Sequence, residues 1–284
     1  MSSSRSNIKL HFPSIIGFTD NELSNIILSI NDYYREWEII KSDKNTGKPK
    51  KYKDGTIKRR FIRPSKSKLN EIQTRIKLRI LEKINLPDCI HGGRKKRSNI
   101  TNAKKHQGRK YILTTDLQEF FPSVKPQLIL ETFLGLGYNK QFAHYIMRFV
   151  TWKGELPQGT PTSTHIANIV FLKTDYELME FCKNRGITYT RFVDDLTFSS
   201  QQDFQLLIPE ILNIISSSGF ILSRRKTVYS KNQTVTGIQV FNNKIDASQN
   251  VLEKVEAEKL LPEGIPKYLT RYREQILKTN NKSK

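Results

Sequence analysis

Three aspartates stand beside strand-like segments in a pattern that suits metal chemistry. Asp194 and Asp195 are adjacent and lie between residues 188–192 and 196–199, two segments rich in β-branched and aromatic side chains. Such flanks are typical of a β-hairpin with the acids at its turn. Adjacent carboxylates raise each other's pKa, and a hard divalent cation relieves that repulsion. The pair therefore indicates a cation site, although an Asp-Asp pair alone is also common in solvated turns.

A third carboxylate joins the pair only if the fold brings it there. Residues 111–117 form an apolar segment typical of a buried strand, and Asp116 lies near its end. Asp116 is too far along the chain from Asp194 for a local metal loop, so the acids can meet only on neighbouring strands. Three carboxylates so placed can bind two Mg²⁺ ions, one activating a 3′-hydroxyl and the other stabilising a leaving pyrophosphate. This is the minimum apparatus of a nucleotidyl transferase, and such chemistry needs no Ser/His/Asp or Cys/His group.

The charge of the chain predicts a polyanionic partner. Its formal net charge is +21, from 48 Lys and Arg against 27 Asp and Glu in 284 residues. The basic residues are concentrated in 41–60 and 91–109. The second segment is also rich in Gly, Asn and Ser, which suits a loop laid along a nucleic-acid backbone. A generally basic, well-solvated surface is the alternative.

Cysteine usage and hydropathy exclude several classes of protein. Cys89 and Cys182 are far apart and belong to no Cys/His ligand pattern, so neither a disulfide framework nor a zinc site is expected. No stretch approaches the roughly 18 apolar residues of a membrane span, and no signal peptide is expected. A reducing cytoplasm and no membrane partner are predicted.

Periodicity places the candidate site within a mixed succession of helices and strands. Asp54-Gly55 suits the turn of a basic hairpin between 51–53 and 56–58. Helices are predicted over about 20–37, 69–84, 126–136, 139–150, 162–183, 204–215, 249–260 and 266–278, and further strands over 228–229 and 235–241. This order favours an α+β fold.

Several segments resemble the motifs of one enzyme family. Residues 116–123, 156–163 and 192–196 resemble, in order, the three central palm motifs of reverse transcriptases. Residues 59–64, followed by Leu69 and Gln73, are similar to the fingers motif of the bacterial enzymes. Asn102-Ala103-Lys104-Lys105-His106 and Val235-Thr236-Gly237 resemble the NAxxH and VTG signatures of retron reverse transcriptases. The resemblance covers roughly residues 20–245.

The resemblance implies a right-hand polymerase palm, an antiparallel sheet with helices, together with fingers and a small helical thumb. Residues 1–240 would hold the interleaved fingers and palm, and residues 241–284 the C-terminal thumb. By similarity, Asp116, Asp194 and Asp195 would hold two Mg²⁺ ions, with the backbone carbonyl of Leu117 as an additional ligand.

The resemblance also assigns residues around the incoming dNTP. Phe121 would be the steric gate that excludes a 2′-hydroxyl, with core packing as its alternative. Gln158-Gly159 would approach the nucleotide or the template base, unless they form an ordinary turn. Arg59 or Arg60 would bind the triphosphate. Lys226 would lie near the leaving group as proton donor or charge stabiliser, unless it is simply solvated.

RNA-binding positions follow from the retron signatures and from the C-terminal segment. A hydrogen-bonding role is favoured over metal ligation for His106, and a helical segment would put it on one face with Asn102. The C-terminal segment combines charge with aromatic rings, as a thumb helix against RNA would, although a plain capping helix is the alternative. The residues predicted to bind RNA are Asn102, His106, Val235, Thr236, Gly237, Lys267 and Arg271.

Two departures from the family pattern leave the carboxylates intact. Phe192 replaces the usual Tyr before the Asp-Asp pair, which alters contact with the primer strand, and Thr164 stands where Pro is common.

The function that the resemblance implies is that of a retron-type reverse transcriptase. It would copy part of a cognate structured non-coding RNA into DNA, priming from an RNA 2′-hydroxyl, within an anti-phage defence system whose effector is a separate polypeptide. Another bacterial polymerase of this fold, of the intron or abortive-infection type, is one alternative. A catalytically inactive RNA-binding scaffold is the other.

Overall fold

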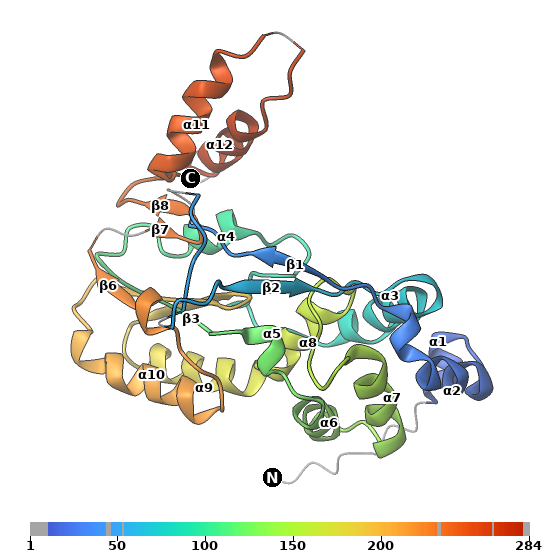
Figure 1. The fold of residues 1–284 in the computed structure, drawn as a ribbon. Helices are drawn as coiled ribbons and strands as arrows, with labels where there is room; N and C mark the ends of the chain where they lie inside the picture. Colours follow the sequence, from blue (N-terminus) through green and yellow to red (C-terminus); the bar gives the residue numbers. More distant parts are fainter. Residues whose placement is uncertain (1–10, 44–46, 53, 232–233, 263, 281–284) are drawn as a thin grey trace. The chain divides into compact units, whose positions relative to one another are not determined.

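The computed structural model describes residues 11–43, 47–52, 54–231, 234–262 and 264–280. The chain forms two compact units, each assembled from separate stretches of sequence (Figure 1). The first consists of Met1–Leu86 with Glu119–Phe171, and the second of Pro87–Gln118 with Leu172–Lys284. No helix among the described residues is long and apolar enough to cross a membrane.

The first unit is mainly helical. Phe12 is buried at its core against the rings of Phe142, Tyr145 and Phe149. Thr19 caps the second helix through a capping box with Glu22, which satisfies amides that the first turn would otherwise leave unpaired. Its helices are α1 (Phe12–Ile16), α2 (Asp20–Leu28), α3 (Ser67–Arg79), α5 (Phe120–Ser123), α6 (Pro126–Gly135), α7 (Lys140–Val150) and α8 (Ser163–Val170).

A two-stranded antiparallel ribbon, β1 (Trp37–Ile40) and β2 (Arg59–Ile62), carries the basic segment of the first unit. The predicted helix over 20–37 is therefore too long, because Trp37 pairs with Ile62 in this ribbon. The predicted Asp54-Gly55 turn is present, with Gly55 in the left-handed region and the Asp54 carboxylate accepting from Thr56. Lys53 lies outside the described residues.

The second unit contains the sheet that carries the aspartates. The strand order is β4 (Thr188–Phe192), β5 (Asp195–Ser200), β3 (Tyr111–Asp116) and β6 (Val228–Ser230), and every pairing is antiparallel. Helix α9 (Leu172–Lys183) packs on β4, and α10 (Ile208–Ser217) packs on α9. The predicted helix over 162–183 is wrong as a single element, because α8 ends at Val170 and α9 begins at Leu172. The prediction of an α+β fold with helices and an antiparallel sheet is confirmed.

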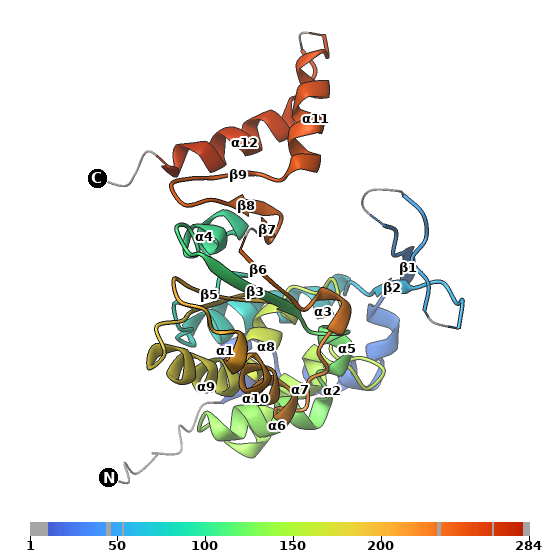
Figure 2. The same cartoon turned by 90° about the vertical axis from the view of Figure 1, so that its left-hand side faces the viewer.

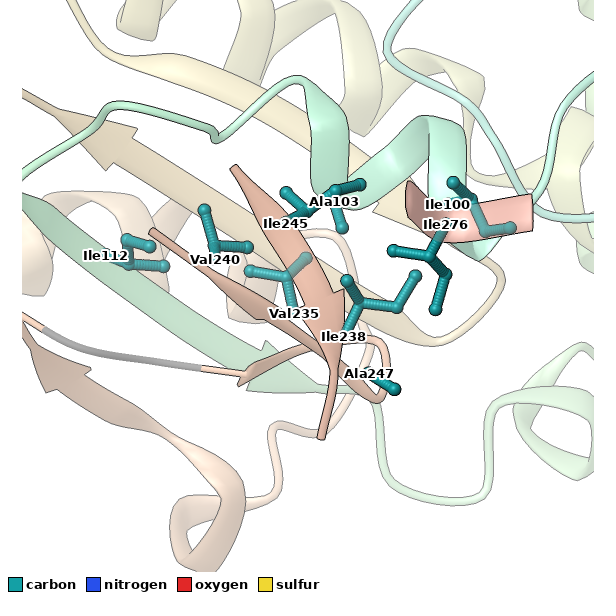
Figure 3. Packing of buried hydrophobic residues seen from close by; sticks show 9 residues of the cluster. All are labelled: Ile100, Ala103, Ile112, Val235, Ile238, Val240, Ile245, Ala247 and Ile276. Atoms are coloured by element: carbon teal, nitrogen blue, oxygen red, sulfur yellow. The ribbon is translucent and has the colours of Figure 1, made fainter. Parts of the chain in front are cut away.

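A smaller sheet follows in the same unit, with β7 (Thr234–Val235), β8 (Ile238–Val240) and β9 (Ile245–Ala247). The strand predicted over 235–241 is thus a tight hairpin with Thr236 and Gly237 at its turn. Figure 2 shows α12 (Tyr268–Lys278) along β9, with α11 (Gln249–Lys259) before it. Figure 3 shows the shared core, to which α4 (Asn99–Lys104) and β3 contribute: Ile100, Ala103, Ile112, Val235, Ile238, Val240, Ile245, Ala247 and Ile276.

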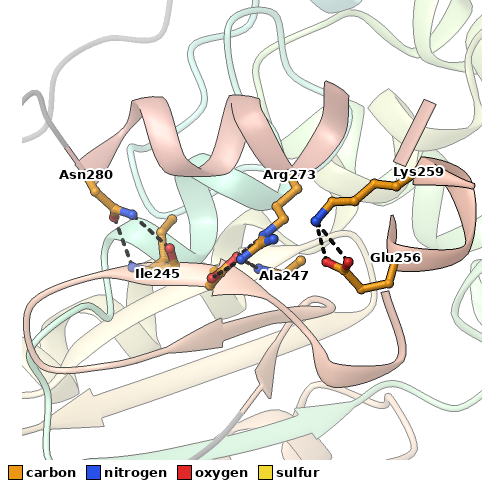
Figure 4. Close-up of polar contacts among 7 residues, drawn as sticks. Ile245, Ala247, Glu256, Lys259, Arg273 and Asn280 are labelled. Atoms are coloured by element: carbon orange, nitrogen blue, oxygen red, sulfur yellow. Dashed lines mark hydrogen bonds and ion pairs between the residues drawn. The ribbon is translucent and has the colours of Figure 1, made fainter. Parts of the chain in front are cut away.

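Polar contacts also fasten α12 to β9 (Figure 4). Arg273 donates to both carboxylate oxygens of Asp246, at 3.1 and 3.3 Å. Asn280 pairs with the backbone amide and carbonyl of Ile245. The predicted boundary between residues 240 and 241 falls within the β8–β9 hairpin, and the division into fingers, palm and thumb stays a prediction.

Candidate active site

The structure brings the three predicted carboxylates to one end of the β3–β5 pair. Asp116 is the last residue of β3, and in the antiparallel register it lies opposite Asp195, the first residue of β5. Asp194 precedes it in the turn from β4. The amide of Leu117 donates to the carbonyl oxygen of Asp194 at 2.9 Å, which fastens the turn to the end of β3.

The turn itself is tight and conformationally demanding. Phe192 pairs with Asp195, so only Val193 and Asp194 connect β4 to β5. Val193 has φ 59°, in the left-handed region that a β-branched residue rarely adopts. The surrounding structure must therefore hold this turn in place.

The electrostatics of the cluster favour a positive ligand. Burial raises the pKa of Asp195 to about 7, and the charges of Asp194 and Asp116 raise it in the same direction. Lys226 opposes this effect, since its Nζ lies 2.5 Å from Oδ2 of Asp116. Asp116 is almost fully buried, whereas more than half of the Lys226 side chain is exposed. The cation of Lys226 thus lies against the carboxylate cluster and opposes part of the rise in the pKa of Asp195.

Backbone contacts explain how Lys226 reaches Asp116. The amide of Ser223 donates to the carbonyl oxygen of Asp116 at 2.8 Å, and the amide of Gln118 donates to Ile221 at 2.7 Å. The segment before Lys226 therefore runs along the end of β3. The structure brings Lys226 to the carboxylates, and its chemical role stays a prediction.

The donor set fits a hard divalent cation. Carboxylate oxygens are the ligands that Mg²⁺ prefers. Burial, and then the charges of Asp194 and Asp116, raise the pKa of Asp195, and a bound cation would offset both effects. Within the described residues, no three His, Cys, Asp or Glu side chains are already arranged as a metal site. In this arrangement Asp116 accepts a hydrogen bond from Lys226 and forms an ion pair with it. Ligation by Asp116, Leu117, Asp194 and Asp195 stays a prediction.

The five other residues predicted to bind nucleotide belong to the first unit. Arg59 is paired with Glu38, whereas Arg60 is exposed on β2. Phe121 is half-buried beside Phe120 in α5. Their roles at a nucleotide stay predictions.

Gln158 and Gly159, also in the first unit, form a turn close to the strand that carries the arginines. The carbonyl oxygen of Gln158 accepts from the amide of Arg63 at 2.6 Å. Gly159 has φ 101°, and a Cβ there would lie 3.2 Å from the Ile62 side chain. Glycine is therefore required by the backbone of this turn, whatever the pair contacts.

The NAxxH segment is not one helix, because α4 ends at Lys104 and His106 lies in the following turn. The expectation that Asn102 and His106 share a helix face is therefore wrong. The predicted hydrogen-bonding role of His106 is confirmed: Nδ1 lies 2.7 Å from Oγ of Ser199, and Nε2 lies 2.6 Å from Oγ1 of Thr190. Burial lowers the pKa of His106 to about 3, so the ring is neutral.

The two retron-like signatures contact each other, which sequence reasoning did not anticipate. Nδ2 of Asn102 lies 3.4 Å from Oγ1 of Thr236, and Val235 is buried in the shared core. Asn102 and His106 are fully buried, and RNA binding by these side chains stays a prediction. Thr236 and Gly237 both have positive φ, as their tight hairpin requires.

Lys267 and Arg271 lie at the start of α12. Lys267 precedes the helix and donates to the carbonyl oxygen of Lys259, and Arg271 is exposed. Both are accessible to a polyanion, and their contact with RNA stays a prediction.

Comparison with known proteins identifies the family. Residues 48–240 match the family model "Reverse transcriptase (RNA-dependent DNA polymerase)". The chain is 31% identical over 205 residues to Retron Ec86 reverse transcriptase from Escherichia coli, covering 70% of this chain and 64% of that protein. It is 30% identical over 191 residues to Retron Se72 reverse transcriptase from Salmonella heidelberg, covering 67% of this chain and 47% of that protein.

The fold is similar to a solved structure of apo telomerase from Candida tropicalis, truncated from its C-terminal domain. The match has a TM-score of 0.46 and 14% sequence identity, and it covers 80% of this chain and 60% of the telomerase chain. The assignment to a family rests on the matches in sequence. The chain spans less than two thirds of the length of both retron enzymes. This chain belongs to the reverse transcriptase family, and its curated relatives include several retron reverse transcriptases.

Proposed function

We propose that the chain is a retron-type reverse transcriptase, an RNA-directed DNA polymerase that copies part of a cognate structured non-coding RNA into DNA. The observation that carries the proposal is the meeting of Asp116 with Asp194 and Asp195 at one end of the β3–β5 pair, with Asp195 held at a raised pKa. The retron relatives support the choice of an RNA template.

Two Mg²⁺ ions would be held by Asp116, Asp194, Asp195 and the carbonyl oxygen of Leu117. When bound, they supply activation of a 3′-hydroxyl and neutralisation of the triphosphate charge. The carboxylates must be deprotonated for this, so cation binding is expected to release the proton that the raised pKa of Asp195 favours. Lys226, which engages Asp116, would donate a proton to the leaving group or stabilise its charge.

Residues of the first unit would select the nucleotide. Arg59 or Arg60 binds the triphosphate, and the exposed guanidinium of Arg60 leaves its donors accessible to phosphate. Phe121 excludes a 2′-hydroxyl and thus favours dNTP over rNTP. Gln158 and Gly159 lie against the nucleotide or the template base.

The net charge of +21 supports a nucleic-acid partner. In this proposal the partners are the cognate RNA, its DNA product and a separate effector protein, and the setting is cytoplasmic defence against phage. The segment between His91 and Arg109, with Thr236, Lys267 and Arg271, provides the RNA-binding surface in this proposal.

Extension of a primed RNA template with dNTP and Mg²⁺ tests the proposal. The native chain is expected to incorporate nucleotides, and Asp194→Asn or Asp195→Asn is expected to reduce the rate by at least about a thousandfold, since the lost interactions amount to several kcal/mol. Asp203→Asn is the matched control, because Asp203 is an exposed aspartate of the same unit, bonded to Tyr229.

Two results would contradict the proposal. One is that the native chain, supplied with the RNA that co-purifies with it, incorporates no nucleotide. The other is that the Asp194 and Asp195 variants extend the primer as fast as Asp203→Asn. RNA binding without incorporation would favour the inactive scaffold instead.

A further inference from the structure

A fully buried arginine lies two positions before the catalytic turn. Arg191 has no exposed surface, and its guanidinium forms a two-pronged ion pair with Asp175 of α9. Nε lies 2.9 Å from Oδ1 and Nη2 lies 2.6 Å from Oδ2. Asp175 is also fully buried and accepts a third hydrogen bond from the hydroxyl of Tyr189 at 2.8 Å.

The third guanidinium nitrogen, Nη1, contacts the turn between β4 and β5. Nη1 of Arg191 donates to the carbonyl oxygen of Val193 at 2.9 Å. Val193 is the residue whose left-handed conformation allows the turn to be so tight. A β-branched residue does not adopt that conformation without external support. The Arg191 contact provides such support directly.

The other side of the turn is held by the segment that precedes the basic loop. The amide of Arg191 donates to the carbonyl oxygen of Cys89, and the amide of His91 donates to that of Arg191, both at 2.8 Å. Gly92 then lies so close to the turn that a Cβ would be 2.5 Å from the amide nitrogen of Val193 and 2.6 Å from its Cγ2. Only a residue without a side chain fits there.

Stability alone does not account for this arrangement. A buried ion pair is about as stable as apolar residues of the same volume, because desolvation offsets the attraction. Its distinguishing property is geometric, since the planar fork of Arg191 fixes Asp175 on one side and the Val193 carbonyl on another. Lysine cannot make all three contacts.

We propose that Asp175, Arg191 and Gly92 form a turn clamp that positions Asp194 and Asp195 for cation binding. Arg191 holds the carbonyl oxygen of Val193 by a hydrogen bond, and the backbone at Gly92 limits the movement of Val193 from the opposite side. The three are positioning residues, and their link to catalysis rests on the proposed polymerase function.

The first test measures hydrogen exchange of the free protein and does not depend on activity. Arg191→Lys keeps the charge beside Asp175 but loses the fork, and Gly92→Ala presses on Val193 while leaving the ion pair in place. Both are expected to speed exchange of the segment 192–195 by about fivefold to tenfold, Arg191→Lys because the turn loses one hydrogen bond and Gly92→Ala because the added Cβ displaces Val193. Exchange within β3, Tyr111–Asp116, should be unchanged.

Tyr189→Phe is the matched control. It removes a hydrogen bond to Asp175 but leaves the contact between Arg191 and Val193. It should lower the unfolding temperature while leaving exchange of 192–195 as in the native chain.

The second test measures the Mg²⁺ concentration that gives half-maximal primer extension. Arg191→Lys and Gly92→Ala should each raise it by about tenfold or more, as is usual for residues that orient metal ligands, with the KM for dNTP unchanged when Mg²⁺ is saturating. Tyr189→Phe should not move it.

The turn clamp is refuted if both variants keep native exchange at 192–195, or if Tyr189→Phe changes exchange and Mg²⁺ requirement as much as they do. If Arg191→Lys does not fold, Gly92→Ala decides by itself. If the native chain does not polymerise, the proposed function fails, while the exchange experiment still decides whether the clamp holds the turn.

Discussion

Two polar sites lie along β5, and their electrostatics are opposite. At the start of the strand is the acid end, formed by Asp116, Asp194 and Asp195. Near its finish is the histidine end, where His106 lies between the hydroxyls of Ser199 and Thr190. The ring of His106 is neutral and both its nitrogens are hydrogen-bonded, whereas the acid end concentrates like charges beside Lys226.

The difference separates polar groups that stabilise the fold from those that await a ligand. At the histidine end, every buried polar atom of the ring has a partner, so burial costs little and the contacts add stability. At the acid end, the carboxylates still repel one another in the folded protein. Ionised groups that the fold keeps together although this costs stability are a sign of function. The same strand thus carries both a structural site and a candidate catalytic site.

Breaking the histidine end should have the largest effect on stability. His106→Ala leaves the buried hydroxyls of Ser199 and Thr190 without their partner, and the free energy of unfolding is expected to fall by about 2–4 kcal/mol. Urea denaturation measures the change. His144→Ala, at an exposed position of α7, should change it by less than about 0.5 kcal/mol. Equal effects of the two variants would refute the role given to His106.

Neutralising the acid end should raise the free energy of unfolding, an effect of opposite sign to that of His106→Ala. The folded pKa of Asp195 is about 7 and its ordinary value is 3.8, so the folded chain holds this proton more tightly than the unfolded chain. The carboxyl therefore reduces stability as the pH rises from about 4 through 7. Without divalent cations, Asp195→Asn should become more stable than the native chain over that range, by more than about 1 kcal/mol at the upper end.

The comparison must be made between the two proteins at each pH. Burial lowers the pKa of His91 and His106, so protonation of these rings destabilises both proteins as the pH falls below about 6.5. That effect cancels in the difference. A stability difference that does not vary with pH would show that the folded chain does not raise the pKa of Asp195.

The sequence was sufficient to predict the acid end. Strand-like flanks and the order of the motifs indicated that Asp116 would meet the Asp194–Asp195 hairpin on neighbouring strands, and the register pairs Asp116 with Asp195. The strand-like flanks are local signals, whereas the meeting of Asp116 with a distant hairpin was implied by the ordered motifs of the family resemblance.

The histidine end and the turn clamp could not be predicted in this way. His106 bonds to Thr190 and Ser199, and Arg191 bonds to Asp175, so each contact depends on how distant segments pack. The one local signal was a charged residue, Arg191, within an otherwise buried strand. Helix lengths were also overestimated where an apolar period continues across a break, as at Phe171.

Titration of the aspartate carboxyls by NMR, with ¹³C-labelled aspartate, tests the central claim most directly. In the absence of divalent cations, one carboxyl is expected to titrate near pH 7, to be missing from Asp195→Asn, and to shift well downward when Mg²⁺ is added. If every aspartate instead titrates near the ordinary value of about 3.9, or if Mg²⁺ leaves the raised midpoint unchanged, the three carboxylates do not form a cation site.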